Sequence, residues 1–339
     1  MTSNPTFGAK TSAFHVAELF SSRIKGKIAL VTGASVDTLG EQTARAFAHG
    51  GASTVIITGR DGERLSALQK SLASEYPSTG FRSLDMDLAS FKSIRRAAKE
   101  ILDDDSIPRI DFLIANAAMA LVKEHTFTED GLELSFGVNH IGHFLLIVEL
   151  FPKIRKAAQA STAGETRIII LTSGAMFVSP VRFSDYNFER KPLPEDEQPN
   201  WELAKQTGAT PTDGYHMWIS YGASKSANTL LALHLNKLLS KRYGIQSYAV
   251  HPGTVGTRGV KALPFDAEQV KALGFMKTID QGTSTTMVAA LDPKLSPETA
   301  LFLQDCLVST PPAWAADESK AARLWQLSEE IIGQKLELS

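Results

Sequence analysis

The sequence predicts an α/β fold in which a doubly wound (Rossmann) parallel sheet of about seven strands carries helices on both faces. Three observations lead to this fold class. Short β-branched runs recur along the chain, longer segments with helical spacing separate them, and the runs are apolar at nearly every position rather than at alternate ones. Strands of that kind are buried on both sides, as in a parallel sheet covered by helices. Their alternation with helices is the doubly wound plan.

The predicted strands leave room for a helix between one and the next. They are KIALVTG (27–33), TVIITGR (54–60), DFLIANA (111–117), RIIILTS (167–173), QSYAVHPG (246–253) and ALFLQD (300–305). Helical spacing is clearest in ERLSALQKSLASEY (63–76) and NTLLALHLNKLLSKRYG (228–244). Residues 174–220 break this rhythm with prolines and mixed charges, and we interpret them as an inserted loop. We therefore expect an N-terminal extension over 1–25 and a single domain over 26–339.

Composition narrows the classes of partner. The chain has 339 residues, of which 43% are hydrophobic and 21% charged, as in ordinary globular proteins. A net charge of -2 gives no reason to expect nucleic acid as a partner. Cys306 is the single cysteine, which excludes an intrachain disulfide and fits a reducing, cytoplasmic setting. The longest apolar stretch, at 141–151, is too short to span a bilayer, so we expect no membrane span.

The turn after the first strand, VTGASVDTLG (31–40), suits a phosphate. The strand ends at Gly33, and a helix beginning near Leu39 would aim its free N–H groups and positive dipole end at the crevice beyond the sheet. Asp37 and Thr38 stand where a further glycine is expected. By itself, however, such a turn is equally well explained as a steric strand-to-helix corner.

The end of the second strand favours NADP(H) over NAD(H). Arg60 stands where the adenosine ribose should lie, and a guanidinium can hold a 2'-phosphate with two parallel hydrogen bonds. Asp61 follows directly, but we place it on the helix side of the strand end. Asp37 opposes this assignment, because a carboxylate near a phosphate costs Coulomb energy unless it points to water.

The segment SYGASKSANT places Tyr221 and Lys225 four residues apart, on one face of a helix. A free phenol has a pKa of about 10, and a nearby cation lowers it by roughly 1 to 3. Lys225 is the cation at hand. Pairs with this spacing also occur by chance on many helix surfaces, so the pair alone does not identify a site.

Two other pairs suggest rival chemistry. His140 and His143 are three residues apart, a spacing that can bind metal, but no thiol or carboxylate cluster completes a site, so we expect packing and no metal. Ser173 with His251 would suit a hydrolase, yet no G-x-S-x-G elbow surrounds the serine.

Several motifs in order resemble the short-chain dehydrogenase/reductase superfamily from about residue 26 to the end. They are TGASVDTLG, IANAA, DGLELSFGVNHIGHFLL, ILTS, YGASK and HPGTVGT. Within the superfamily, GVNHIGHFLL, the insertion before the tyrosine and the ending ARLWQLSEEIIG look most like the retinol-dehydrogenase-like branch and related fungal ketoreductases. The resemblance implies an NADP(H)-dependent oxidoreductase that acts on a carbonyl or a secondary alcohol, more often as a reductase.

The resemblance also implies a catalytic set of Asn139, Ser173, Tyr221 and Lys225. Tyr221 would protonate the carbonyl oxygen, or take the hydroxyl proton in the oxidative direction. Lys225 would lower the pKa of that phenol and bond the nicotinamide ribose. Ser173 would hold the substrate oxygen, and Asn139 would hold a water that connects Lys225 to solvent.

Cofactor contacts follow from the same resemblance. Asp87 and Leu88 would line the adenine, Asn116 would brace the central strands, and Thr257 would contact the carboxamide end. The full predicted set is Gly33, Ser35, Thr38, Leu39, Gly40, Arg60, Asp87, Leu88, Asn116, Ala117, Tyr221, Lys225, Pro252, Gly253, Val255 and Thr257. The longer glycine turn and Ala118, which replaces a family glycine, put the cofactor affinity in question.

The substrate pocket is expected between the insertion and the region after Thr257. Its apolar candidates suit a bulky organic substrate, such as a polyketide-like, terpenoid or aromatic ketone, although each residue could equally belong to the core. They are Met119, Met176, Phe177, Trp218, Phe265 and Phe275. Two alternatives stay open: a non-redox lyase or epimerase, and a cofactor-binding regulator, against which the intact catalytic set argues. Relatives that pair through their two long helices make a homodimer a further expectation.

Overall fold

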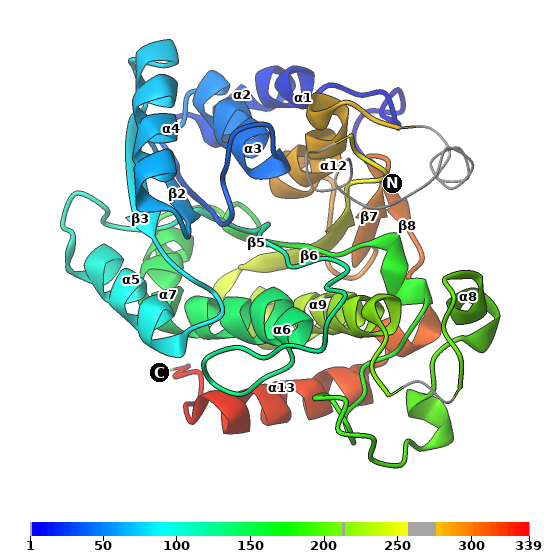
Figure 1. Cartoon of the computed structure of the whole chain (residues 1–339). Coiled ribbons are helices and arrows are strands. Elements are labelled where there is room, and N and C mark those ends of the chain that lie inside the picture. Colours follow the sequence, from blue (N-terminus) through cyan, green and yellow to red (C-terminus); the bar gives the residue numbers. More distant parts are fainter. Residues whose placement is uncertain (1, 212–213, 257–275, 339) are drawn as a thin grey trace.

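An eight-stranded sheet forms the centre of the protein in a computed structural model that describes residues 2–211, 214–256 and 276–338 (Figure 1). Its order is β3-β2-β1-β4-β5-β6-β7-β8. Every described neighbouring pair is parallel except β7 and β8, so the predicted fold class is confirmed. The strands are β1 (Ile28–Val31), β2 (Thr54–Gly59), β3 (Gly80–Asp85), β4 (Phe112–Ala115), β5 (Arg167–Leu171), β6 (Gln246–His251), β7 (Phe302–Gln304) and β8 (Leu307–Ser309).

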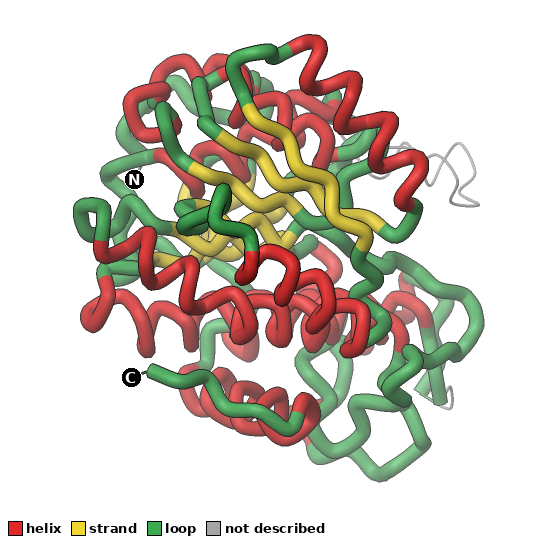
Figure 2. The backbone as a smooth tube through the Cα atoms, turned by 90° about the vertical axis from the view of Figure 1, so that its left-hand side faces the viewer, coloured by secondary structure: helices red, strands yellow, loops and turns green. Residues whose placement is uncertain are grey.

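Helices cover both faces of the sheet (Figures 1 and 2). One face packs against α1 (Ala13–Leu19), α2 (Ser21–Ile24), α3 (Leu39–His49), α4 (Gly62–Glu75) and α12 (Ile279–Leu291). The other packs against α5 (Phe91–Asp103), α7 (Gly142–Gln159) and α9 (Met217–Tyr243), with α13 (Glu318–Ile332) outside α9. The shorter helices are α6 (Leu134–Phe136), η1 (Gly137–Ile141), η2 (Gly174–Phe177), η3 (Glu195–Glu197), α8 (Trp201–Gln206) and η4 (Ala313–Ala315).

The strand order places the switch point of the fold between β1 and β4. The chain leaves β1 toward β2 and β3, then returns to the other side of β1 to form β4 and β5. Connections that diverge to opposite faces open a crevice beyond the carboxyl ends of these strands, where ligands of such sheets bind.

Two strands escaped the sequence prediction because they lie at the edges of the sheet. In β3 most side chains are exposed or half-buried, and its sequence GFRSLD lacks the apolar run of a central strand. In the short β8 one residue is exposed and two are half-buried. Cys306, expected in a strand, lies in the turn between β7 and β8 with a φ of 62°, fully buried.

One continuous helical stretch of the described chain, Leu134–Gln159, is long and apolar enough to cross a membrane. However, 89% of its most apolar window is buried inside the protein. It comprises α6, η1 and α7, and α7 packs against α5 and α9. Its apolar character is therefore explained by its position in the core.

The two segments predicted to lie outside the regular sheet plan both carry helices. In the N-terminal segment, α1 packs on α3 and α12, and the N–H of Ala13 donates to Asp280 Oδ1 at 3.1 Å. The segment 174–220 contains η2, η3 and α8, and has a small apolar cluster that includes Phe188 and Ile219.

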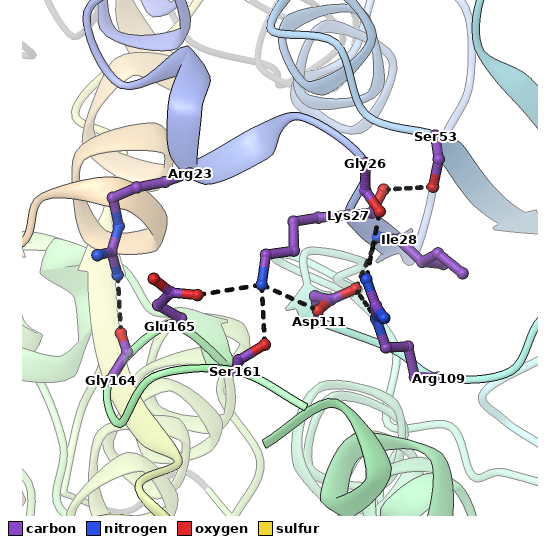
Figure 3. A network of polar contacts seen from close by, with 10 residues as sticks. All are labelled: Arg23, Gly26, Lys27, Ile28, Ser53, Arg109, Asp111, Ser161, Gly164 and Glu165. Carbon is purple, nitrogen blue, oxygen red and sulfur yellow. Dashed lines mark hydrogen bonds and ion pairs between the residues drawn. The ribbon is translucent and has the colours of Figure 1, made fainter. Parts of the chain in front are cut away.

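A polar network closes the amino end of the sheet, opposite the crevice (Figure 3). The fully buried Asp111 accepts hydrogen bonds from the N–H of Ile28 (2.9 Å) and from Arg109 Nε (3.1 Å). Lys27 Nζ lies 3.5 Å from its other oxygen and 3.1 Å from Glu165. Removal of one partner from such a buried ion network leaves an uncompensated charge, so it would destabilise the junction of β1 and β4.

Candidate active site

A cavity of about 360 Å³ lies at the carboxyl ends of β1, β2, β3 and β4. Its walls include nine predicted cofactor contacts: Gly33, Ser35, Thr38, Leu39, Arg60, Asp87, Leu88, Asn116 and Ala117. It is also lined by residues not assigned to the cofactor from sequence: Thr58, Gly59, Met86, Ala118, Met119 and Val138. Three of the latter, Gly59, Met86 and Ala118, directly neighbour predicted residues at strand ends, so the strand pattern could have indicated them.

The two glycines of the opening turn are required by close backbone contacts. Gly33 has a φ of 70°, and a Cβ added there would lie 2.7 Å from Cα of Ala117. A Cβ at Gly40 would lie 2.5 Å from the carbonyl oxygen of Gly33. Both distances are too short for real atoms, so the turn needs both glycines whether or not a phosphate binds. Gly40 lies behind the cavity wall rather than on it.

Asp37 and Thr38 have structural roles in the same turn. Asp37 adopts a φ of 62°, a left-handed conformation that aspartate tolerates better than most residues, and its N–H donates to Glu41 Oε2 at 2.7 Å. Thr38 is the N-cap of α3, and its hydroxyl donates to the carbonyl of Ser35 at 2.6 Å. The residues that depart from the family pattern thus shape the turn, and Asp37 is not part of the described cavity wall.

Arg60 lies on the cavity wall, whereas Asp61 caps a helix. Arg60 lines the cavity directly after β2 and has no ion-pair partner within the described ranges. Asp61 is the N-cap of α4, accepts the N–H of Arg64 at 3.1 Å and pairs with its guanidinium at 3.1 Å. The carboxylate therefore serves the helix, which leaves Arg60 as the charge at this corner of the cavity.

Asn116 joins the two strands that flank the switch point. Its Nδ2 donates to the carbonyl of Thr32 at 2.7 Å and to that of Gly33 at 3.3 Å. Its own N–H donates to Thr32 Oγ1 at 2.9 Å. These bonds tie the end of β4 to the end of β1, where the cavity opens.

Three members of the predicted catalytic set meet at the end of β5. Lys225 is fully buried on α9, and its Nζ donates to the carbonyl of Leu171 at 3.0 Å and lies 5.6 Å from the ring centre of Tyr221. Ser173 follows β5 as the N-cap of η2, and it forms a side-chain hydrogen bond with Tyr221.

Burial controls the protonation of this pair. It raises the pKa of Tyr221 to about 12, against the hydrogen bond with Ser173, and it lowers the pKa of Lys225 to about 7. Sequence spacing predicted a lowered phenol pKa; the structure gives the opposite direction, because desolvation outweighs a lysine that is itself partly neutral near pH 7. A phenol that keeps its proton at neutral pH can act as an acid, which suits the reductive direction.

Asn139 lies in the π-helical turn η1, a type of distortion often found at functional sites. Its Oδ1 accepts the N–H of Met119 at 2.7 Å, and its Nδ2 donates to the carbonyl of Met119 and to Ser224 Oγ, both at 2.9 Å. Ser224 in turn donates to the carbonyl of Tyr221 at 2.7 Å. The side chain of Asn139 thus connects the cavity wall at Met119 to the helix that carries Tyr221.

The segment after β6 approaches the cavity through Val255. Val255 is buried, and with the cavity residue Leu39 it fills the space that a side chain at Gly282 would occupy. Gly253 has a φ of 85° and packs on Lys277, directly after the half-buried Pro252. The predicted residues Thr257, Phe265 and Phe275 lie outside the described residues.

The described substrate-pocket candidates separate into wall and core. Met119 lines the cavity, whereas Met176 is fully buried and its sulfur contacts the hydroxyl groups of Thr172 and Thr229, so Met176 belongs to the core. Phe177 and Trp218 are half-buried.

His140 and His143 engage different partners. Nε2 of His140 lies 2.8 Å from Ser328 Oγ on α13, whereas Nε2 of His143 lies 2.8 Å from Thr32 Oγ1 at the end of β1. Burial lowers the pKa of His140 to about 3 and that of His143 to about 4. Among the described residues, no group of three or more His, Cys, Asp or Glu side chains could hold a metal ion.

Comparison with known proteins gives consistent matches. A family profile described as short chain dehydrogenase matches residues 27–187. Oxidoreductase fscI of Fusarium equiseti is 35% identical over 250 residues, which cover 73% of this chain and 94% of that protein. Retinol dehydrogenase 13 of Homo sapiens is 30% identical over 317 residues, covering 91% and 86%. The fold is similar to that of NADPH-bound carbonyl reductase from chicken fatty liver, with a TM-score of 0.60, 23% identity and coverage of 84% and 99%.

Proposed function

The chain belongs to the short chain dehydrogenase family, in its retinol-dehydrogenase-like and fungal oxidoreductase branch, and from that premise we propose that it is an NADP(H)-dependent oxidoreductase. It reduces a ketone or aldehyde, or oxidises a secondary alcohol, with Tyr221 as the general acid or base. The observation that carries the proposal is the meeting of Tyr221, Ser173 and Lys225 at the end of β5. Hydrogen bonds through Ser224 and Asn139 connect Tyr221 to Met119 on the cavity wall.

The residues of the cavity fit a dinucleotide. Gly33 keeps the backbone of the turn free of a side chain, and α3 begins at the cavity with Thr38 as its cap, so the positive end of the helix would favour a phosphate there. Asp87 and Leu88 line the cavity and would hold the adenine. Arg60 supplies a guanidinium without an ion-pair partner in the described chain, suited to a 2'-phosphate. That the related fold of carbonyl reductase is described with NADPH supports the same choice.

The chain's own residues handle the proton and the substrate oxygen. When bound, the reduced nicotinamide supplies a hydride to the carbonyl carbon. Ser173 donates a hydrogen bond to the carbonyl oxygen and holds it next to the phenol. Tyr221 then gives its proton to that oxygen, and in the oxidative direction it takes the proton back. Lys225 stabilises the negative charge left on the phenol, because that charge favours protonation of the buried amine.

A bulky apolar organic substrate is part of the proposal. The match to a retinol dehydrogenase supports it, since retinol is a bulky apolar alcohol. The position of the apolar Met119 on the cavity wall, where its backbone bonds to the side chain of Asn139, supports it as well.

The non-redox and regulatory alternatives have less support. A cofactor-binding regulator needs no Ser173 hydroxyl bonded to the half-buried phenol of Tyr221. A hydrolase that uses Ser173 with His251 needs a hydrogen bond between them, and none is found in the described residues.

The test is a panel of bulky ketones and aldehydes offered with NADPH or NADH, with cofactor absorbance and product followed together. We expect NADPH to be consumed, one molecule for each alcohol formed. Product without net cofactor consumption would indicate a lyase or epimerase, and tight NADPH binding with no product from any compound would favour the regulator.

A further inference from the structure

His143 lies at the centre of a chain of hydrogen bonds that joins two parts of the candidate site. It is fully buried on α7, one turn after Asn139. Its Nδ1 lies 2.9 Å from the carbonyl oxygen of Asn139, and its Nε2 lies 2.8 Å from Thr32 Oγ1. Thr32 directly precedes Gly33 of the cofactor turn, and 111 residues of sequence separate it from His143.

The partners of Thr32 determine which way each proton points. A hydroxyl group offers one donor and two acceptor sites. The N–H groups of Asn116 (2.9 Å) and Ala117 (3.0 Å) can only donate, so together they fill both acceptor sites of Thr32 Oγ1. The hydroxyl of Thr32 then donates its proton to Nε2 of His143 at 2.8 Å, since the alternative acceptor, the carbonyl oxygen of Ile114, is 3.4 Å away.

It follows that Nε2 of His143 accepts and carries no proton. A carbonyl can only accept, so Nδ1 must carry the proton and donate to Asn139. A second proton, on Nε2, would face an oxygen whose acceptor sites are already filled. Burial agrees with this assignment, because it holds the pKa of His143 near 4, and the nearby Lys225 acts in the same direction.

We propose that His143 is a positioning residue, fixed as the neutral Nδ1–H tautomer, that couples the cofactor turn at Thr32 to the π-helical turn that carries Asn139. Through Asn139 and Ser224 the chain of bonds continues to the backbone of Tyr221. His143 touches neither the cavity nor the reacting groups, and it acts by holding the dinucleotide turn and the catalytic helix in register. This inference deepens the proposed function and rests on it where cofactor affinity is concerned.

The tautomer is tested without any cofactor. In protein labelled with ¹⁵N-histidine, long-range ¹H–¹⁵N correlation distinguishes the two tautomers and the cation, and the His143→Phe spectrum identifies the signal of His143. We expect a neutral ring protonated at Nδ1 from pH 6 to pH 8. A ring protonated at Nε2, or one that titrates in this range, overturns the proposal.

The coupling is tested on NADPH affinity with matched variants. His143→Phe keeps the aromatic shape and removes both hydrogen bonds, and we expect the Kd for NADPH to rise about 10-fold or more, the scale of an unsatisfied buried polar group. His143→Gln restores an acceptor for Thr32 and should recover part of the affinity. The control is His140→Phe. His140 lies beside Asn139 in η1, but its side chain bonds to Ser328 on α13 rather than to Thr32, so its Kd should stay within about 2-fold of wild type.

A double-mutant cycle with Thr32→Val separates coupling from general damage. If the two residues act through one bond, the Kd of the double variant rises by less than the product of the two single effects. Independent effects, or a His143→Phe variant with wild-type Kd, overturn the proposal. Should His143→Phe fail to fold, His143→Gln replaces it, both in the cycle and as the variant whose missing signal identifies His143 in the tautomer measurement. Wild-type protein that binds no NADPH contradicts the proposed function instead, and the tautomer result still stands or falls by itself.

Discussion

Replacement of Arg60 by alanine should change cofactor choice more than any other single substitution in the cavity. Its guanidinium lies after β2 on the cavity wall, without an ion-pair partner in the described part of the chain. Asp61, the nearest carboxylate in sequence, is committed to the cap of α4 and to Arg64. Nothing else in the described wall offers a positive side chain to a 2'-phosphate.

The magnitude follows from the exposure of the side chain. A hydrogen bond to a charged group contributes about 1.5 to 3 kcal/mol, and solvent exposure places Arg60 at the low end of this range. A loss of about 1.5 to 2 kcal/mol corresponds to a Kd for NADPH that is about 10- to 30-fold higher. The Kd for NADH, which lacks the phosphate, should change by less than about 2-fold.

Fluorescence titration of both cofactors at physiological salt measures the effect. Arg64→Ala is the matched control, because this arginine is 85% exposed, pairs with Asp61 and does not line the cavity. It should leave both affinities unchanged. Equal losses for NADPH and NADH in Arg60→Ala, or no loss for either, would refute the assignment of Arg60 to the phosphate.

Three further predictions concern stability and shape. Burial lowers the pKa of Lys225 from 10.5 to about 7, so between those pH values the unfolded chain binds more protons than the folded chain. The stability of the wild type should therefore rise relative to that of Lys225→Met by about 2 kcal/mol from pH 7 to pH 9 in urea unfolding, and a constant difference would contradict this. Asp111→Ala should lower the free energy of unfolding by about 3 to 5 kcal/mol, because it leaves Lys27 and Arg109 without their buried partner (Figure 3). The affinity for NADPH should not change, since this network lies at the end of the sheet opposite the cavity, and a loss of affinity without a loss of stability would contradict the prediction. Gly33→Ala should abolish tight NADPH binding, since its Cβ would clash with Ala117. The control Gly131→Ala also has a positive φ but its Cβ meets nothing within 4 Å, so it should lower only stability; equal NADPH affinities of the two variants in calorimetric titrations would contradict the steric argument.

The central strands were predictable because their burial is written into the sequence. Runs such as IALV in β1 and FLIA in β4 are apolar at every position, as two-sided burial requires. In the edge strand β3, Arg82 is exposed and Ser83 bonds to Gln69 of α4, so no continuous apolar run marks this strand.

The residues of the candidate site were predictable where a local rule fixes them. Four-residue spacing places Tyr221 and Lys225 on one face of α9, and the start of α4 explains why Asp61 caps a helix while Arg60 stays on the cavity wall. The family pattern located Ser173 at the end of β5. Local spacing and the family resemblance place these residues without any tertiary contact.

What the sequence could not give depends on depth and on long-range contact. The pKa of Tyr221 rises instead of falling, because the phenol is desolvated. Spacing along the sequence does not reveal how strongly Tyr221 and Lys225 are desolvated. Met176 is apolar like a pocket residue yet fully buried in the core. The bond between Thr32 and His143 joins the residue directly after β1 to helix α7, and only the parallel order of β1 and β4 brings these two together.

The proposed reaction depends most on the phenol of Tyr221 as the proton donor. The most direct measurement is single-turnover oxidation of bound NADPH by a reducible ketone, compared between wild type and Tyr221→Phe after both have been shown by titration to bind NADPH. We predict an unchanged Kd within about 2-fold and a rate at least about 100-fold lower in the variant, the scale of a lost general acid. A variant that binds NADPH and oxidises it at the wild-type rate would contradict the account.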